Sequence, residues 1–445
     1  MVSLLRRIAI DITPLQRSKD FRRIWTGLLI AGAGFHFTVV ASFVQVFELT
    51  GSNTAVGFVG LVGLAGIVLG IALGGTFIDA VDRRTTLMWA QVCGGAGSSV
   101  LLLTTLVDEP PIFVVYAAVA LIAGSSSIDA SARNAIVPRL VGHDLLPSAL
   151  ALNQVVMNAT ALLGPAVAGL VIANLGLTTA YGVDVCSYLA MFAIIWTIRR
   201  VPPEPGHLPE TGLTALVNGF RYLRGRGVLQ AAFGADLVAM IYGMPRALFP
   251  VIAVSQFGRG AEVAGLLFAA PAVGAVLGAL TGGWVRKVRY QGRAVLWAVA
   301  AWGASVAAFG LVDRLWLALL LLSVAGAADV VSAIFRGTIV QLSVPDHLRG
   351  RLSGINYLVV AGGPRLGDLR AGVVATAFSP TFSVVSGGLL CIAGAAVIGL
   401  LVPSFRRYEA IEDRPEGPAV GTAQVQRDRR RDEGSSHHGE KPRST

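Results

Sequence analysis

The sequence predicts an all-α membrane protein with twelve transmembrane helices in two homologous six-helix halves. The chain of 445 residues is 54% hydrophobic and only 14% charged, with a mean hydropathy of +0.67. These values are too apolar for a water-soluble globule. Long apolar stretches recur along the chain, and about 20 apolar residues suffice to span a bilayer as a helix. A glycine pattern also occurs twice, once in each half.

The predicted elements follow one another in a simple order. A cytoplasmic segment (1–23) precedes an N-terminal six-helix bundle (24–198). A cytoplasmic linker (199–227) leads to a C-terminal six-helix bundle (228–403) and a disordered cytoplasmic tail (404–445). The predicted spans are Ile24–Phe47, Ala55–Phe77, Leu87–Val107, Ile112–Val137, Ala149–Ala173, Thr179–Ile198, Val228–Ala253, Val263–Val285, Ala294–Val312, Leu315–Val340, Leu352–Phe378 and Thr381–Val402. Prolines such as Pro202 and Pro203 cannot continue a helix and mark the linker. Within the linker, Thr214–Arg226 is expected to be a basic amphipathic helix on the membrane surface.

Two internal sequence repeats show that the halves are related. Five glycines of the second span match five of the eighth at one offset of 208 (265 − 57). The pairs are Gly57 and Gly265, Gly66 and Gly274, Gly70 and Gly278, Gly74 and Gly282, and Gly75 and Gly283. Downstream, 133–137 (RNAIV) resembles 336–340 (RGTIV) at an offset of 203 (336 − 133), and Asn153 and Asn356 follow at matching positions. Two homologous membrane-embedded halves are typical of transporters that rock around a central site.

The net charge of +10 is explained by membrane topology. Lys and Arg gather at alternate ends of the spans, whereas the opposite loops contribute only Arg259 and Arg314. This positive-inside bias places both termini in the cytoplasm of a multi-pass protein of the cell inner membrane or plasma membrane. It also argues against nucleic acid as a partner.

Other chemistries lack their sequence patterns. The three cysteines are isolated, and no metal-ligand spacing, Walker sequence, HExxH or GxSxG is present. We therefore expect no enzyme activity, no metal and no cofactor.

The end of the second span carries a family signature. The segment 74–84 (GGTFIDAVDRR) resembles the loop motif of the major facilitator superfamily, in which Gly75, Asp79, Arg83 and Arg84 fit the pattern. Ala80 and Asp82 depart from it, which leaves the detailed gating contact open. A carboxylate at one helix end can face the positive N-terminal end of another helix and latch one conformation. The alternative is that these charges only mark the membrane surface.

A second motif concerns direction of transport. The segment 162–170 (LLGPAVAGL) resembles the Gly-Pro motif of exporters in this superfamily, through Gly164, Pro165 and Gly169. Ala168 replaces a usual glycine, and ordinary tight helix packing is the simpler interpretation. Across the chain, 131–153, 219–229 and 362–372 resemble the branch that contains siderophore exporters and drug and macrolide efflux proteins.

Ionisable side chains inside the spans should mark the transport path. They are His36, Asp129, Arg133, Asp184, Asp236, Arg246, Asp329, Arg336, Arg365, Asp368 and Arg370. Asp129 and Arg133 lie four residues apart, and Arg365 and Asp368 three apart, so each pair can neutralise itself on one helix. Arg133 and Arg336, near the cytoplasmic ends of their helices, are interpreted as structural residues that hold the adjacent loop. Asp236 and Arg246 lie about 15 Å apart along a helix and need partners elsewhere.

The resemblance places some of these residues on cavity-lining helices. These residues are His36, Asp236, Arg246 and Asp329. Together with the charges of the eleventh span, the candidate cavity residues are His36, Arg246 and Arg370, and the candidate proton carriers are Asp236, Asp329 and Asp368. Arg246 and Arg370 lack a local helical partner, which favours anionic cargo. The alternative is that a carboxylate neutralises them across helices and leaves a neutral pocket for macrolide-like drugs.

The sequence therefore predicts a secondary active transporter that exports a small organic molecule such as a siderophore in exchange for protons, with the bilayer as its surroundings. A multidrug or macrolide efflux pump is the alternative. An importer on the same scaffold and a non-transporting receptor are further alternatives.

The latch hypothesis gives a first prediction. Asp79→Asn should slow transport strongly while the protein still inserts and binds substrate, because the neutral amide no longer stabilises the latched conformation. Export rates in membrane vesicles, compared at equal protein levels, measure this effect. Export at the rate of the unaltered protein would contradict the hypothesis.

Overall fold

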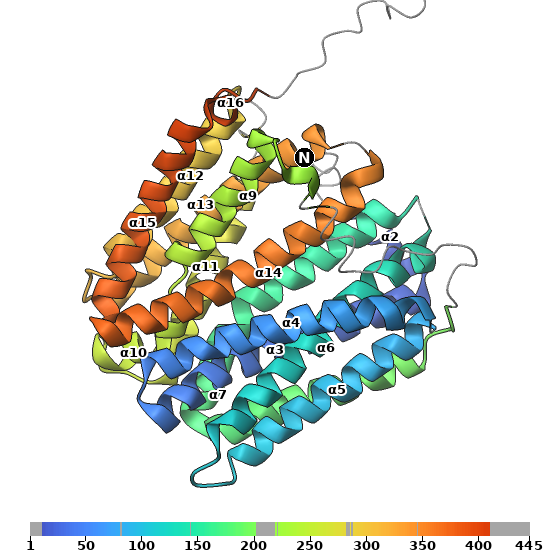
Figure 1. The fold of residues 1–445 in the computed structure, drawn as a ribbon. Helices are drawn as coiled ribbons and strands as arrows, with labels where there is room; N and C mark the ends of the chain where they lie inside the picture. Colours follow the sequence, from blue (N-terminus) through green and yellow to red (C-terminus); the bar gives the residue numbers. More distant parts are fainter. Residues whose placement is uncertain are drawn as a thin grey trace, which may run out of the picture. The chain divides into compact units, whose positions relative to one another are not determined.

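A computed structural model shows the fold of the chain (Figure 1). It describes residues 11–80, 82–142, 144–201, 219, 221–281, 285, 288–344 and 346–409, but not the side chains of 74–80, 346–351 and 353. The expected tail lies largely outside these ranges, and of the expected linker helix only 219 and 221–226 are described.

The described part of the chain is helical almost throughout. The first half contains α2 (Thr13–Arg17), α3 (Lys19–Thr50), α4 (Asn53–Ala80), α5 (Arg83–Thr104), α6 (Ile112–Val141) and α7 (Leu146–Trp196). The second half contains α9 (Gly227–Gly243), the 3-10 turn η1 (Arg246–Leu248), α10 (Phe249–Ser255), α11 (Ala261–Leu280), α12 (Gln291–Phe309), α13 (Leu315–Ser343), α14 (Asp346–Ala377), α15 (Pro380–Leu401) and α16 (Pro403–Arg406).

Local chemistry sets several of the helix ends. The Ser18 hydroxyl accepts the Phe21 N–H at 3.2 Å and caps the start of α3. Gly51, with a φ of 60°, ends α3 in the left-handed conformation that glycine adopts without steric cost. The Asp82 side chain caps α5 by accepting the Arg84 N–H at 2.8 Å.

Twelve passes can be followed in the described residues. Ten helical segments are long and apolar enough to cross a membrane. One of them, α7, makes two passes because Gly176, with φ 82° and ψ 171°, interrupts it. The twelfth pass is α14, whose charged side chains lower its hydropathy. The twelve predicted spans in two halves are thereby confirmed.

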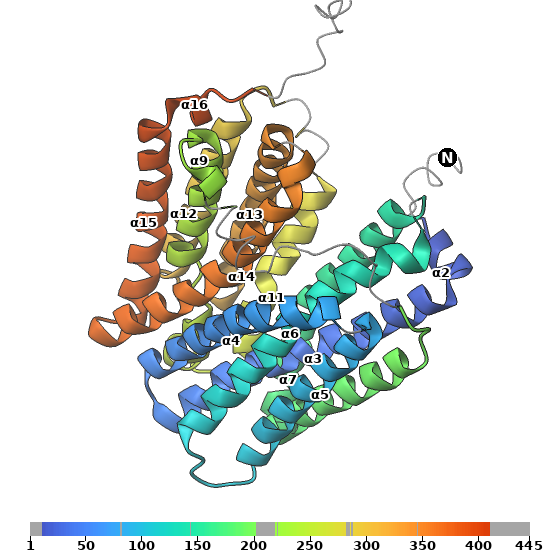
Figure 2. The same cartoon turned by 45° about the vertical axis from the view of Figure 1, so that its right-hand side comes forward.

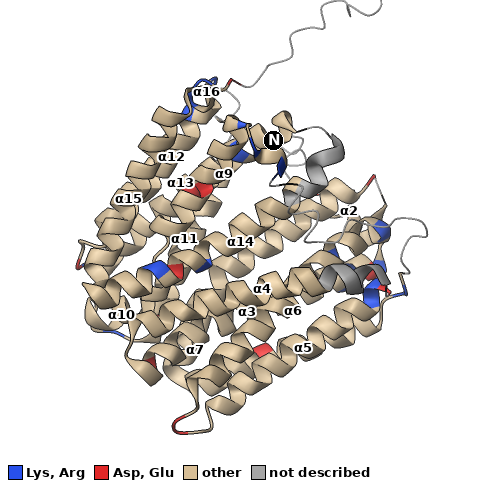
Figure 3. Cartoon of the chain, in the orientation of Figure 1, with Lys and Arg blue, Asp and Glu red and all other residues tan. Residues whose placement is uncertain are grey.

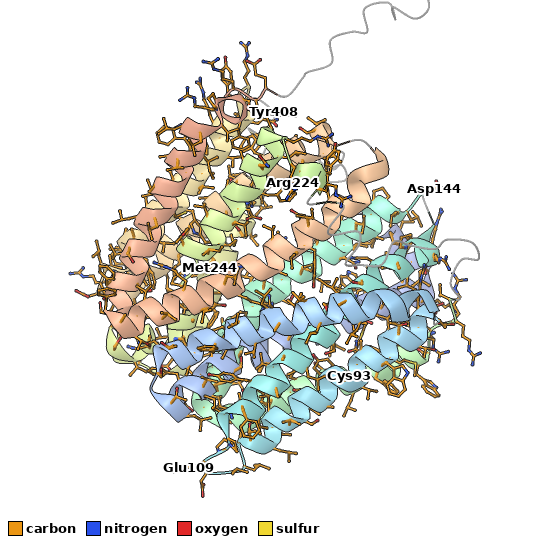
Figure 4. The ribbon with its side chains drawn as sticks, viewed as in Figure 1. Cys93, Glu109, Asp144, Arg224, Met244 and Tyr408 are labelled. Carbon is orange, nitrogen blue, oxygen red and sulfur yellow. The ribbon has the colours of Figure 1, made fainter. Side chains whose placement is uncertain are left out.

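The seventh span differs from the prediction of one continuous helix over Val228–Ala253. The structure ends α9 at Gly243, and the chain resumes at η1 and α10 after an extended Met244. Pro245 and Pro250 have no N–H to donate, which favours a break here. Figure 4 shows Met244 well inside the helix bundle. The break places Arg246 on a short turn rather than on a helix face.

Apolar clusters fill each half, and one of them reaches across to the other half. In the first half, two clusters join α3, α4, α5, α6 and α7, and one of these also includes Ala247 of η1 and packs against Phe268 of α11. In the second half, one large cluster joins α9 to α13 with α14 and α15. The two bundles are visible as the blue-to-green and green-to-red halves of Figure 2.

The repeated glycines pack in the same way in both halves. A side chain on Gly66 in α4 would clash with the carbonyl of Ala120 in α6, and one on Gly274 in α11 would clash with that of Ser323 in α13. Ala120 and Ser323 are themselves related by the offset of 203 (323 − 120). Glycine therefore lets α4 approach α6, and α11 approach α13, at equivalent positions.

The first glycine of each copy instead joins the two halves. A Cβ on Gly372 in α14 would lie 3.0 Å from the Cα of Gly57 in α4. A Cβ on Gly169 in α7 would lie 2.8 Å from the Cα of Gly265 in α11. We call these contacts the α4–α14 seam and the α7–α11 seam.

Both seams lie toward one side of the membrane region. Gly57 is close to the start of α4 and Gly265 to the start of α11, so the seams lie on the side opposite to the start of α3 and the end of α15. We call the latter the termini side. Figure 4 shows Tyr408 and Arg224 at that side and Glu109 at the other.

The glycine packing gives a second prediction. Gly274→Ala should destabilise the protein, because the added methyl meets fixed backbone atoms and overpacking costs typically 1–3 kcal/mol, on the order of a few degrees of melting temperature. Thermal unfolding in detergent measures the loss.

Gly182→Ala is the matched control, since no atom lies within 4 Å of its added Cβ. Alanine is a better helix former than glycine, so this variant should melt at the same temperature or slightly higher. Equal melting temperatures for the two variants would contradict the packing account.

Candidate functional site

A polar cavity opens between helices of the second half near the termini side. It has a volume of about 640 Å³ and is lined by Ala232, Phe233, Asp236, Ala333, Arg336, Gly337, Val340, Gln341, Leu342, Val344, Leu352, Asn356 and Val360. These residues come from α9, α13, the residue after α13, and α14. The wall is mostly apolar, with a few polar groups that converge, as is usual for small-molecule sites.

The strongest electrostatic feature of the cavity is the ion pair between Asp236 and Arg336. Asp236 on α9 contacts the Arg336 guanidinium on α13, and both residues are buried. Asp329, two turns earlier on α13, lies 4.0 Å from Arg336 (Oδ1 to Nη2). The interpretation of Arg336 as a residue that holds the adjacent loop is wrong, because its side chain reaches into the cavity toward α9.

A second ion pair occupies the seam side of the same half. Arg246 of η1 donates to Asp368 of α14 at 2.7 Å, and Asp368 is completely buried. The Asp368 carboxylate packs under α4, because a Cβ on Gly60 would lie 3.2 Å from its Oδ2. Asp236 and Arg246 thus each have a partner on another element.

The expected pairing of Arg365 with Asp368 is wrong. Asp368 is bound by Arg246, and Arg365 donates instead to the carbonyl of Ala361 at 2.6 Å. The backbone break before η1 brings Arg246 to α14, which spacing along one helix could not indicate. Because Asp368 neutralises Arg246, this arginine no longer favours an anionic substrate.

Arg370 also has protein partners in place of a ligand. Its guanidinium donates to the carbonyl oxygens of Tyr242 and Ser383, at 3.3 and 3.1 Å, and to the Ser386 hydroxyl at 3.2 Å. The side chain faces α9 and α15 and does not line the polar cavity. The prediction that Arg370 lines the cavity is therefore wrong for this polar cavity.

The first half holds its charges in local networks. Arg133 pairs with Asp129 on α6, and the Gln91 amide donates to Asp129 at 2.8 Å. Asp184 on α7 is almost completely buried and accepts hydrogen bonds from Thr38 at 2.6 Å and Ser98 at 2.8 Å. Sequence analysis did not single out these hydroxyl and amide donors, because Ser, Thr and Gln in apolar spans carry no distinctive spacing. Figure 3 shows how few charges lie within the bundles compared with the helix ends.

The Gly-Pro motif lies at the α7–α11 seam. Gly169 and the Pro165 carbonyl both contact Gly265, and a Cβ on Gly164 would lie 2.9 Å from the Cγ of His36. His36 on α3 also stacks edge-on against Phe35. His36 therefore packs against the motif, and it is not among the residues that line the polar cavity.

The loop motif is only partly visible. The contacts of Gly75 and the side chain of Asp79 are outside what the structure describes. Arg84 donates to the carbonyls of Ile195 and Trp196 at 3.2 and 2.5 Å, and Arg83 donates to that of Ala135 at 3.3 Å. Arg84 thus satisfies carbonyls at the end of α7, where positive charge is favourable, and Arg83 ties the start of α5 to α6.

The fold and the cavity define a class of protein. Twelve passes in two related halves, with a polar cavity near the termini side and the seams that join the halves on the opposite side, are the architecture of a secondary transporter of the major facilitator superfamily.

Comparison with known proteins identifies the family. Residues 10–430 match the family described as transmembrane secretion effector. The chain belongs to this family, and it is a secondary active exporter and a multi-pass membrane protein.

Similar curated proteins cover nearly the whole chain. The chain is 26% identical over 411 residues to the enterobactin exporter EntS of Citrobacter koseri, covering 92% of this chain and 98% of that protein. It is 27% identical to EntS of Shigella boydii, over 90% and 95% of the two chains.

Solved structures show the same fold. A bacterial homologue of the iron transporter ferroportin in the inward-facing state matches with a TM-score of 0.65 at 14% identity, over 88% of this chain and 99% of that one. The POT family transporter PepTSo matches with a TM-score of 0.68 at 13% identity, over 88% and 99%.

The buried ion pair gives a third prediction. Asp236→Asn and Arg336→Gln should each destabilise the protein, because removing one partner leaves a buried charge that costs on the order of 3–5 kcal/mol. The double variant should be more stable than the sum of the two losses predicts. Melting temperatures of the four proteins in detergent form a double-mutant cycle. Simple additivity would show that the two groups do not interact.

Proposed function

We propose that this protein exports a metal-chelating small organic molecule of the siderophore type, in exchange for protons. The polar cavity with the Asp236–Arg336 ion pair carries the proposal, because charges within membrane spans usually mark a substrate or ion path. The similarity to enterobactin exporters over about nine-tenths of the chain supports the substrate class. The protein needs no ATP in this scheme.

The proposed orientation places both termini in the cytoplasm, as the positive-inside rule favours. Arg84, Arg139 and Arg199 lie near helix ends on the termini side. The seams then hold the halves together near the outer face, and the cavity is reached from the cytoplasm. Substrate loading from inside the cell is the step that such a conformation serves.

Proton exchange requires a carboxylate that is accessible and not permanently paired. Asp368 is fully buried and bound by Arg246, and Asp236 contacts Arg336 directly. Asp329 is 33% exposed and lies 4.0 Å from a guanidinium that Asp236 already neutralises. Among Asp236, Asp329 and Asp368, we therefore favour Asp329 as the proton carrier.

The gating proposal from the loop motif remains part of this scheme. Asp79 would stabilise the conformation in which the termini side is closed. The basic neighbours Arg83 and Arg84 hold the starts and ends of the adjoining helices in place.

The fourth prediction concerns the coupling of substrate movement to proton movement, which an assay in proteoliposomes measures. An enterobactin gradient should drive proton movement, seen with a pH-sensitive dye inside the vesicles. Asp329→Asn should abolish this movement and leave passive substrate exchange, because an amide cannot carry the proton.

Glu48→Gln, which removes an exposed carboxylate outside the cavity, is the matched control and should behave like the unaltered protein. Movement of a lipophilic cation or a macrolide, but not of enterobactin, would contradict the substrate class. Normal proton movement in single Asn variants at Asp236, Asp329 and Asp368 would contradict the coupling.

A further inference from the structure

Three ionised groups meet at Arg336, and their charges do not balance. Arg336 contributes one positive charge, and Asp236 and Asp329 contribute two negative charges, which leaves an excess of one negative charge. These are the charges that act on Asp329 in the described part of the chain. Asp236 occupies the direct contact, so Asp329 keeps acceptor capacity that the protein does not use.

Asp329 lies on the cavity face of α13. Ala333, Arg336 and Val340 line the cavity, and Asp329 precedes Ala333 by four residues. Residues three and four apart share one helix face, so Asp329 extends this wall one turn deeper. The Asp329 side chain is 33% exposed, whereas that of Asp236 is 6% exposed. A ligand that extends one turn beyond the lining residues Ala333 and Arg336 can therefore reach this carboxylate beside a guanidinium.

The first half has no such excess at the equivalent place. The repeat offset of 203 relates Asp329 to Ser126 and Arg336 to Arg133. In the described residues, the charge of Arg133 is balanced by one carboxylate, that of Asp129. At this position of the repeat, the surplus carboxylate is thus specific to the second half, where the polar cavity lies.

A carboxylate beside a guanidinium is complementary to a particular chemical group. Asp329 accepts only, and Arg336 donates only, so the matching ligand presents an O–H next to an acceptor oxygen. Catechols, hydroxamic acids and α-hydroxy acids all carry two adjacent oxygens of this kind. These are also groups that chelate hard metal ions through oxygen.

We propose that Asp329 and Arg336 bind the protonated, metal-free form of a chelating group and reject its metal complex. Chelation removes the O–H protons and leaves anionic oxygens, which cannot donate to Asp329 and are repelled by it. This inference rests on the proposed function, and it assigns the selectivity of the cavity to one carboxylate. Protonation of Asp329 removes the same acceptor, so protons and substrate compete for one site.

The fifth prediction is a selectivity for the metal-free ligand. Equilibrium binding to the purified full-length protein is measured with metal-free enterobactin and with its gallium(III) complex, which is redox-inert. The unaltered protein should bind the metal-free form about tenfold or more tightly, the size of one hydrogen bond to a charged group. Asp329→Asn should bring the two affinities close together, Asp329→Glu should retain the preference, and Glu48→Gln should leave it unchanged.

The outcomes separate this inference from the proposed function. Equal binding of both forms by the unaltered protein, or an undiminished preference in Asp329→Asn, would overturn the inference and leave the exporter proposal standing. Failure of both forms to bind would overturn both. The Asn variant removes charge from a cluster with an excess of it, so we expect it to fold.

Discussion

The structure depends on one constraint, which is that charges inside a membrane bundle must be ion-paired or hydrogen-bonded by the protein or met by a ligand. Asp236 with Arg336, Asp368 with Arg246, and Asp129 with Arg133 meet this constraint within the protein. Three such pairs fix how α9, η1, α13 and α14 face one another in the second half, and they stiffen α6 in the first. Asp329 is the carboxylate of this group whose charge is left over, and the proposed chemistry of the exporter follows from that surplus.

The glycines determine where the two halves may move. Gly66 and Gly274 hold helices together within a half, whereas Gly57 with Gly372 and Gly169 with Gly265 bring the halves into backbone contact. Side chains also meet between the halves, because Phe43 of α3 packs against Phe268 of α11 with ring centroids 5.7 Å apart. Asp368 and Arg246 lie directly beneath one of these seams, so parting the seam changes the surroundings of a buried ion pair.

Most of the fold could be predicted from the sequence. The length of the apolar stretches, the distribution of Lys and Arg and the spacing of the repeated glycines can each be read directly from the order of the residues. Prediction was less successful for the site. Residues three or four apart share one helix face, and this spacing correctly predicted the pairing of Asp129 with Arg133. The same spacing failed for Arg365 and Asp368, because the break at Met244 brings Arg246 to Asp368. The interpretation that Arg336 holds the adjacent loop fails because depth along a helix does not indicate which neighbouring helix a side chain faces. Arg370 had partners that were backbone carbonyls, which no sequence pattern reveals.

Alternating access is the central claim, and the distance across the α4–α14 seam tests it most directly. The Thr54 N–H donates to the Thr376 hydroxyl at 3.0 Å in this conformation. Spin labels on Thr54→Cys and Thr376→Cys, in a variant without other cysteines, report a short distance by dipolar broadening of the continuous-wave spectrum and a longer one by double electron–electron resonance. The account predicts a short distance without substrate and a second, longer population when substrate or a proton gradient is present. A single short distance under every condition would contradict it.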